Sequence, residues 1–198
     1  RVAASAPLLG LALLAWMTPA VLQGWVPDAH HAWIPQIGLD FDLRLDGLAW
    51  MFAGLVLAIG ALVVMYAHYY LSSEDSAPRF FGCLLLFMGS MLGVVIAGNL
   101  LLLMVFWELT SISSFLLIGF WYKRQDAREG ARMALAITGG GGLALLGGVL
   151  LIGRITGSYD LDVVLSSGDA IRASELYPWV LALVLAGCHA GDADLIRA

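Results

Sequence analysis

Apolar residues in this sequence come in runs of about 20, and that length constrains the fold more than any other feature. A helix of that length crosses the hydrocarbon core of a bilayer and satisfies its backbone polar groups internally, as lipid requires. Only 13% of the residues are charged, about half the share of a soluble domain. Because polar and apolar residues do not alternate within the runs, an outer-membrane barrel is excluded. The sequence predicts an all-α bundle of transmembrane helices.

We predict about six membrane segments in a single membrane domain that covers residues 1–198. Their approximate bounds are 2–22, 47–70, 80–97, 100–122, 131–155 and 177–188. Residues 189–198 form an atypical polar tail, because Asp192, Asp194 and Arg197 would fall inside the membrane if the last segment had the usual length. The first segment follows Arg1 directly, and we interpret it as a spanning helix close to a truncation rather than as a signal peptide.

Basic residues are spread unevenly over the connections, and this bias predicts the orientation in the membrane. Loop 123–130 and its flank hold Lys123, Arg124, Arg128 and Arg132, whereas the basic residues of the opposite side are scattered through longer acidic loops. We therefore expect loop 123–130 to lie in the cytoplasm, and loops 23–46 and 156–175 to lie outside.

Glu108 lies near the middle of the fourth segment. It is roughly 13 Å along that helix, close to the midplane of a ~30 Å hydrocarbon core. A carboxylate at that depth costs a few kcal/mol, and such groups mark proton relays or cation-coupled carriers. Ser111 and Ser114 follow on roughly the same face, with Thr110 beside them, as a candidate polar face for water or another helix. The alternative is a structural Glu108 that hydrogen bonds to a neighbouring helix, on a face that serves ordinary helix packing.

Other polar residues are weaker candidates. His68, at the end of the second segment, could be the entrance of a proton relay or an interfacial histidine satisfied by water. His30 and His31 have no third ligand nearby, so we expect no metal site there. The four glycines at 139–142 have no following Lys-Ser/Thr and are not a phosphate loop. They favour close helix packing, with a local helix break as the alternative.

The loop before the second segment is acidic. We interpret Asp40, Asp42 and Asp46, with Arg44 among them, as a solvated loop face. No basic patch indicates a nucleic-acid partner. The sequence shows no cofactor motif and no nucleophile–base arrangement of an enzyme.

The stretch Asn99–Trp121, NLLLLMVFWELTSISSFLLIGFW, resembles the large antiporter-like subunits shared by respiratory complex I and the Mrp cation/proton antiporters. Within it, FWELTSISSFLLIGFW is most similar to the A subunit of Mrp-type sodium/proton antiporters. Arg44–Gly47 (RLDG) and Leu86–Val95 (LFMGSMLGVV) support the resemblance, which extends from about Trp33 to Gly187.

The resemblance implies that the chain is part of a larger antiporter-like fold that conducts protons along buried polar residues. The family's essential glutamate falls on Glu108, and its partner is a lysine on a later helix. In this sequence that lysine position falls on Gly191, where the chain departs from the family pattern, and the first family helix also has no counterpart. The resemblance therefore implies an N- and C-terminally truncated fragment, which we expect to be inactive alone.

As a function, the resemblance implies a secondary-transporter subunit rather than an enzyme, without cofactor or metal. It would act with other subunits of a Na⁺/H⁺ antiporter in a bacterial inner membrane, moving protons against Na⁺ or another monovalent cation. One alternative is the antiporter-like subunit of a proton-pumping NADH-quinone oxidoreductase. Another is a non-transporting membrane scaffold in which Glu108 is only an assembly contact.

Overall fold

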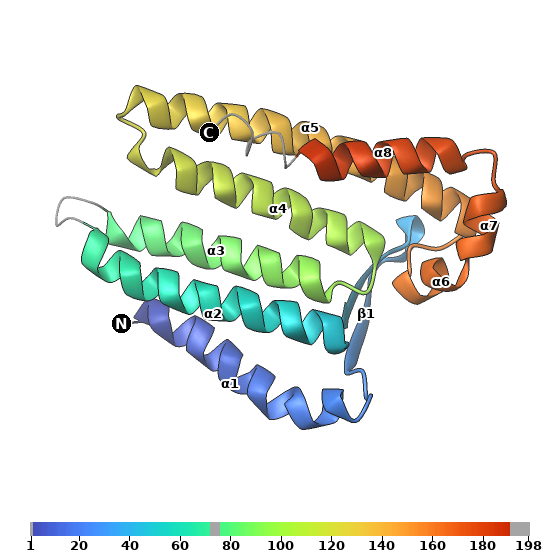
Figure 1. Ribbon diagram of the computed structural model, residues 1–198, viewed down its shortest axis with the longest axis horizontal. Helices are drawn as coiled ribbons and strands as arrows, with labels where there is room; N and C mark the ends of the chain where they lie inside the picture. Colours follow the sequence, from blue (N-terminus) through green and yellow to red (C-terminus); the bar gives the residue numbers. More distant parts are fainter. Residues whose placement is uncertain (1, 72–75, 191–198) are drawn as a thin grey trace.

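The long helices lie side by side in chain order, and the last apolar helix (Tyr177–Ala190) packs back against the longest one (Gln125–Thr156) (Figure 1). The computed structural model describes residues 2–71 and 76–190, apart from the side chains of Val2, His68 and Ala190. Five described helices are long and apolar enough to cross a membrane, and α8 is a shorter apolar helix, so the all-α membrane bundle is confirmed. The elements are α1 (Val2–Leu22), β1 (Asp28–Ile34), η1 (Pro35–Ile37), β2 (Leu39–Arg44), α2 (Gly47–Tyr70), α3 (Ala77–Ile96), α4 (Leu100–Ile118), η2 (Gly119–Trp121), α5 (Gln125–Thr156), α6 (Leu161–Ser166), α7 (Gly168–Ala173) and α8 (Tyr177–Ala190).

Local signals in the sequence set several helix ends. Asp46 caps α2 by accepting a hydrogen bond from the backbone N–H of Ala49 at 2.8 Å. A proline occupies the first turn of α3, where a missing N–H costs nothing. Gly157 ends α5 in the left-handed region, at φ +74°, which glycine adopts without strain. Helix α5 is continuous through residues 139–142, so the four glycines do not break it.

A β-hairpin that the sequence pattern does not predict occupies part of the loop before α2. Strands β1 and β2 pair antiparallel from Asp28↔Arg44 onward, with an irregularity between Ala32 and Ile34. Every residue of β1 is exposed. The strand therefore lacks the alternation of apolar and polar residues by which a half-buried strand is predicted from sequence. The short helices α6 and α7 likewise lie in the predicted loop 156–175. The hairpin and the short helices α6 and α7 lie at the same end of the row of long helices (Figure 1).

At that end, the turn between α3 and α4 is hydrogen bonded to two other parts of the chain. The N–H of Gly98 donates to the carbonyl of Asp42 at 2.8 Å, which ties the turn to β2. On its other side, Leu100 donates to Tyr159 and Leu161 donates to Gly98, each at 2.8 Å. We call this arrangement the hairpin junction; it comprises residues 38–44, 97–100 and 157–162.

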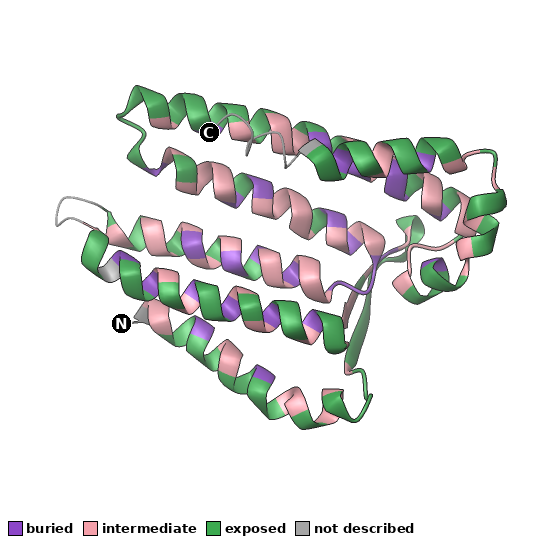
Figure 2. Cartoon of the chain, viewed as in Figure 1, coloured by how far each residue is buried: buried purple, intermediate pink, exposed green. Residues whose placement is uncertain are grey.

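Buried residues lie along the contacts between neighbouring helices, and exposed residues cover the outer faces (Figure 2). One apolar cluster joins α1, α2 and α3 through Leu14, Leu57 and Met88. Another joins α4 to α5 through Met104 and Leu145. Many large apolar side chains remain exposed on the outer helix faces. In a membrane-spanning bundle such faces meet lipid or other helices rather than water.

Candidate functional site

Helix α4 is held at the hairpin junction by Asn99. The Asn99 side-chain oxygen accepts hydrogen bonds from the N–H groups of Leu101 at 2.9 Å and Leu102 at 3.2 Å. Its amide Nδ2 donates to the carbonyl of Gly38 at 2.9 Å, and the residue is only 4% exposed. One side chain therefore caps α4 and ties it to the hairpin. Glu108 lies eight residues beyond Leu100, the first residue of α4, and therefore roughly 12 Å from the start of the helix.

The Glu108 side chain is half-buried and points against helix α5. A Cβ atom built on Gly142 would lie 3.0 Å from Glu108 Cδ and still closer to Oε1, so the carboxylate rests directly on the backbone of α5. The same Cβ would lie 3.5 Å from Cδ1 of Trp107. Within the described residues, no ion pair or hydrogen bond fixes the carboxylate.

The predicted polar face of α4 lines a small pocket beside this contact. Thr110, Ser111 and Ser114 border a cavity of about 280 Å³, which also meets Thr138 of α5 and Gly187 of α8. Thr110 and Ser111 both donate to the carbonyl of Trp107, at 2.6 and 3.3 Å. A hydroxyl that has used its donor on the helix backbone still has acceptor lone pairs. The pocket therefore offers acceptors for water, although Glu108 is not among its lining residues.

Two sequence candidates cannot be placed. The side chain of His68 and the whole of Gly191, where the family lysine position falls, lie outside the described residues. Sequence patterns did not identify two other residues of the site. Thr138 of α5 lines the same pocket as the hydroxyls of α4, and Gly142 lies beneath the Glu108 carboxylate. The glycine run at 139–142 is evident in the sequence. The rotation of α5 about its axis, relative to α4, decides which of these glycines contacts Glu108.

The acidic loop is not the solvated face that its composition suggests. Asp40, Asp42 and Asp160 line a cavity of about 310 Å³ at the hairpin junction, together with His30 and Asn99. One carboxylate oxygen of Asp40 is buried without a hydrogen-bond partner among the described residues. The described residues contain no group of three or more His, Cys, Asp and Glu side chains arranged to hold a metal ion.

The charges around this cavity act on Asp42. Burial raises the pKa of the Asp42 carboxyl above its ordinary value of 3.8, and the neighbouring Asp160 raises it further. His30 and Arg44 lower the pKa of Asp42, and Asp28 raises it. Arg44 is also paired with Asp162 of α6, which links the hairpin to the segment after α5.

A pH-dependent gain in stability is expected for Asp42→Asn. Since the folded state raises the pKa of Asp42, it holds this proton at pH values where the unfolded chain has released it. Stability therefore falls as pH rises from about 3.8 through the folded pKa. Asparagine removes this cost, so the variant should melt at a higher temperature than wild type near neutral pH, with the difference shrinking toward pH 3.

Tryptophan-fluorescence melting of the purified protein in detergent across this range measures the effect. Asp169→Asn is the control, because Asp169 is exposed and pairs with Arg172 within α7. A constant difference between Asp42→Asn and wild type at every pH would contradict the prediction.

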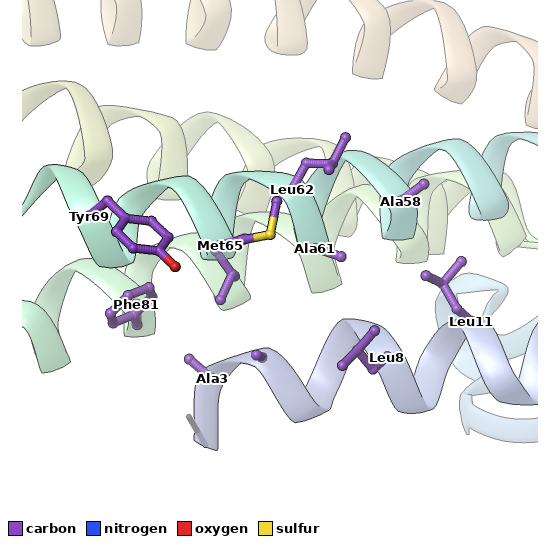
Figure 3. A pocket seen from close by; sticks show the side chains of 11 residues that line it. Ala3, Leu8, Leu11, Ala58, Ala61, Leu62, Met65, Tyr69 and Phe81 are labelled. Carbon is purple, nitrogen blue, oxygen red and sulfur yellow. The ribbon is translucent and has the colours of Figure 1, made fainter.

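A separate apolar groove lies between α1 and α2 (Figure 3). It has a volume of about 590 Å³. Leu8 and Leu11 of α1, Leu62 and Met65 of α2, and Phe81 of α3 are among its lining residues (Figure 3). The groove is lined mainly by apolar side chains, with the phenol of Tyr69 as a polar group, and it suits contact with lipid chains or another apolar helix.

Fold and site together define a class: a multi-pass helical membrane protein with a half-buried carboxylate in the middle of one span. The model of the family described as "NADH:quinone oxidoreductase/Mrp antiporter, TM" matches residues 97–190, and that of "NADH-Ubiquinone oxidoreductase (complex I), chain 5 N-terminus" matches residues 33–81. The chain belongs to this family of antiporter-like subunits, common to complex I and the Mrp antiporters.

Individual relatives agree with this assignment. The chain is 60% identical over 173 residues to a probable K⁺/H⁺ antiporter A/B subunit of Rhizobium meliloti, which covers 87% of this chain. It is 45% identical over 163 residues to a Na⁺/H⁺ antiporter A1 subunit of Staphylococcus haemolyticus, which covers 82%. The chain spans only 17% and 20% of the lengths of these two relatives.

Two solved structures share the fold. The Mrp complex from Dietzia sp. DQ12-45-1b matches with a TM-score of 0.79 and 29% identity, over 94% of this chain and 21% of that one. A membrane-bound sulfane sulfur reductase, an archaeal respiratory membrane complex, matches with a TM-score of 0.73 over 94% of this chain and 29% of that one. At 19% identity, the second match concerns the fold alone.

Proposed function

We propose that this chain is part of the proton-conducting subunit of a multisubunit monovalent cation/proton antiporter, and that Glu108 relays the proton. One observation carries the proposal: a carboxylate lies half-buried in mid-span, with no cation or hydrogen bond holding it among the described residues. A permanently paired carboxylate would be a structural contact, whereas a relay group has to gain and lose its proton.

The surroundings of Glu108 support this role. On the same helix, Thr110, Ser111 and Ser114 line a neighbouring pocket that can hold water, although Glu108 itself does not line it. Two relatives that match more than four-fifths of this chain are named as antiporter subunits, one for K⁺ and one for Na⁺. We infer a bacterial inner-membrane complex whose other subunits are the partners of this chain, with loop 123–130 on the cytoplasmic side.

Two other functions compete with this proposal. The family descriptions name complex I as well as the Mrp antiporters, so a subunit of a proton-pumping NADH-quinone oxidoreductase is the second candidate. The third is a membrane scaffold in which Glu108 is an assembly contact. The lack of a described partner for the Glu108 carboxylate favours transport over a scaffold.

The test is exchange in everted membrane vesicles from a host without its own antiporters. With the complete complex present, Na⁺, K⁺ or Li⁺ added to acidified vesicles should release protons from the lumen, reported by a pH-sensitive dye. The control vesicles hold the complex without this chain and should show no release. Comparing the three cations identifies the transported ion.

Two results would contradict the proposal. Vesicle acidification driven by NADH and blocked by quinone-site inhibitors, without a response to any cation, would assign the chain to an oxidoreductase. A complex that assembles only when this chain is present, but moves protons neither in exchange for a cation nor with NADH, would indicate the scaffold role.

A further inference from the structure

Gly142 makes the closest approach to the carboxylate of Glu108. A Cβ atom at position 142 would meet Glu108 Cδ at 3.0 Å and Oε1 at a distance that real atoms do not adopt. Any side chain at this position would therefore displace the carboxylate. We propose that Gly142 is a positioning residue for the relay, because its missing side chain sets where the Glu108 carboxylate lies against α5. This inference rests on the proposed function, in which Glu108 carries the proton.

The neighbouring glycines have other surroundings. A Cβ at Gly139 or Gly140 would meet nothing within 4 Å. Further along α5, a Cβ at Gly148 would lie 2.8 Å from Val184 of α8, which marks a helix-packing contact. Gly187 of α8 packs back on Leu145 of α5 in the same way, at 2.7 Å. Helix packing thus accounts for the glycines near α8, while Gly142 meets a titratable group instead.

Helix propensity gives no reason for glycine at this position. In a helix interior glycine costs about 1 kcal/mol relative to alanine. Gly142 lies near the centre of the 32-residue helix α5, in a conformation open to every residue type, since the positive φ values fall at Gly24, Gly38 and Gly157. Position 142 therefore requires glycine because Glu108 lies so close to the backbone, not because the backbone conformation excludes alanine.

Contact with Gly142 locates the carboxylate without neutralising it. The N–H groups of a helix interior are committed to bonds within the helix. Gly142 therefore offers no free donor and no charge, and it holds Glu108 through shape alone. The carboxylate oxygens keep their lone pairs for water or for a cation on another element, as proton transfer requires.

The test compares Gly142→Ala with Gly140→Ala in the complete complex. Both substitutions add the same methyl group and the same gain in helix propensity, but only the first meets Glu108. Gly142→Ala should lower cation-driven exchange roughly 10- to 100-fold, the scale expected when a reacting group is displaced by about 1 Å. Gly140→Ala should stay close to wild type. Equal exchange in the two variants, with equal assembly, would overturn the proposal.

A double variant separates positioning from folding. Aspartate is one methylene shorter than glutamate, so Glu108→Asp makes room for a methyl group at position 142. The Gly142→Ala/Glu108→Asp protein should assemble and exchange better than Gly142→Ala alone. If the double variant is no better than the single one, in assembly and in exchange, the proposal is wrong.

Infrared spectroscopy gives a readout that a purely structural role would not move. The carboxyl band of Glu108 is the band lost in Glu108→Gln, and its frequency reports the local environment. It should shift in Gly142→Ala and stay in place in Gly140→Ala; an unshifted band in both would count against the inference. Exchange lost in Glu108→Gln but normal in Gly142→Ala would refute the positioning role and leave the relay intact. Exchange retained in Glu108→Gln would refute the relay itself.

Discussion

Replacing Glu108 with glutamine in the complete complex is expected to reduce cation-driven proton exchange to the background of vesicles without the complex. Glutamine keeps the length and nearly the shape of glutamate, so it fits beside Gly142, but it cannot titrate at physiological pH. Positioned proton transfer is typically worth 10²- to 10⁴-fold in rate, and the loss should be at least about 100-fold. Dye-monitored exchange in vesicles measures it, with assembly checked by copurification of the other subunits.

Glu129→Gln is the matched control for this substitution. Glu129 lies in the first turns of α5 and is exposed, and its carboxylate accepts a hydrogen bond from Gln125 at 2.8 Å. It loses the same negative charge on the same type of side chain, outside the apolar span. Exchange by the Glu129 variant should remain within about twofold of wild type, the variation expected of a surface substitution. Comparable exchange in the Glu108 variant would show that the carboxylate is a structural contact.

Replacing Asn99 with alanine should produce the largest loss of stability at the hairpin junction. The substitution removes the cap of α4, worth about 1 kcal/mol, and the hydrogen bond to Gly38, worth about 1 kcal/mol more. Because the side chain is buried, water cannot replace these bonds easily. The free energy of unfolding should fall by about 2 kcal/mol, measured by denaturant titration of the purified protein in detergent.

Asn99→Ser divides this loss into its two parts. Serine is a good N-cap residue and retains an oxygen for the N–H groups at the start of α4, but it has no amide to donate to Gly38. Its free energy of unfolding should lie between those of wild type and of Asn99→Ala. A change below about 0.5 kcal/mol for Asn99→Ala, typical of uninvolved surface positions, would show that the junction does not depend on this side chain.

The membrane bundle could be predicted because its signal is local. Runs of apolar residues long enough to span a bilayer predict the helices without any knowledge of tertiary contacts. A single carboxylate within such a run is easily recognised as a candidate functional residue. Asp46 and Asn99 could be assigned to a loop and a turn. Their capping contacts follow from standard spacing, but the bond from Asn99 to Gly38 joins residues 61 positions apart and has no local signature.

Long-range pairing accounts for what the sequence did not show. The hairpin β1–β2 is stabilised by pairing and by its contact with the α3–α4 turn, while every residue of β1 is exposed. Asp42 and Asp160 are far apart in the sequence and meet only because that turn is bonded to both segments. Thr138 and Gly142 depend in the same way on how α5 is rotated against α4. Each of these contacts needs the folded arrangement before a residue can be assigned to it.

The hairpin junction also fixes the position of one end of α4. Its backbone hydrogen bonds fasten the Asn99 end of α4 to β2 and to the segment after α5, while the opposite end continues into the short η2 helix. A helix that is fixed at one end changes its tilt by pivoting about that end. Glu108 lies about 13 Å from this anchor, so a tilt of about 5° would carry its carboxylate about 1 Å across the face of α5. Displacements on that scale are enough to make or break a hydrogen bond.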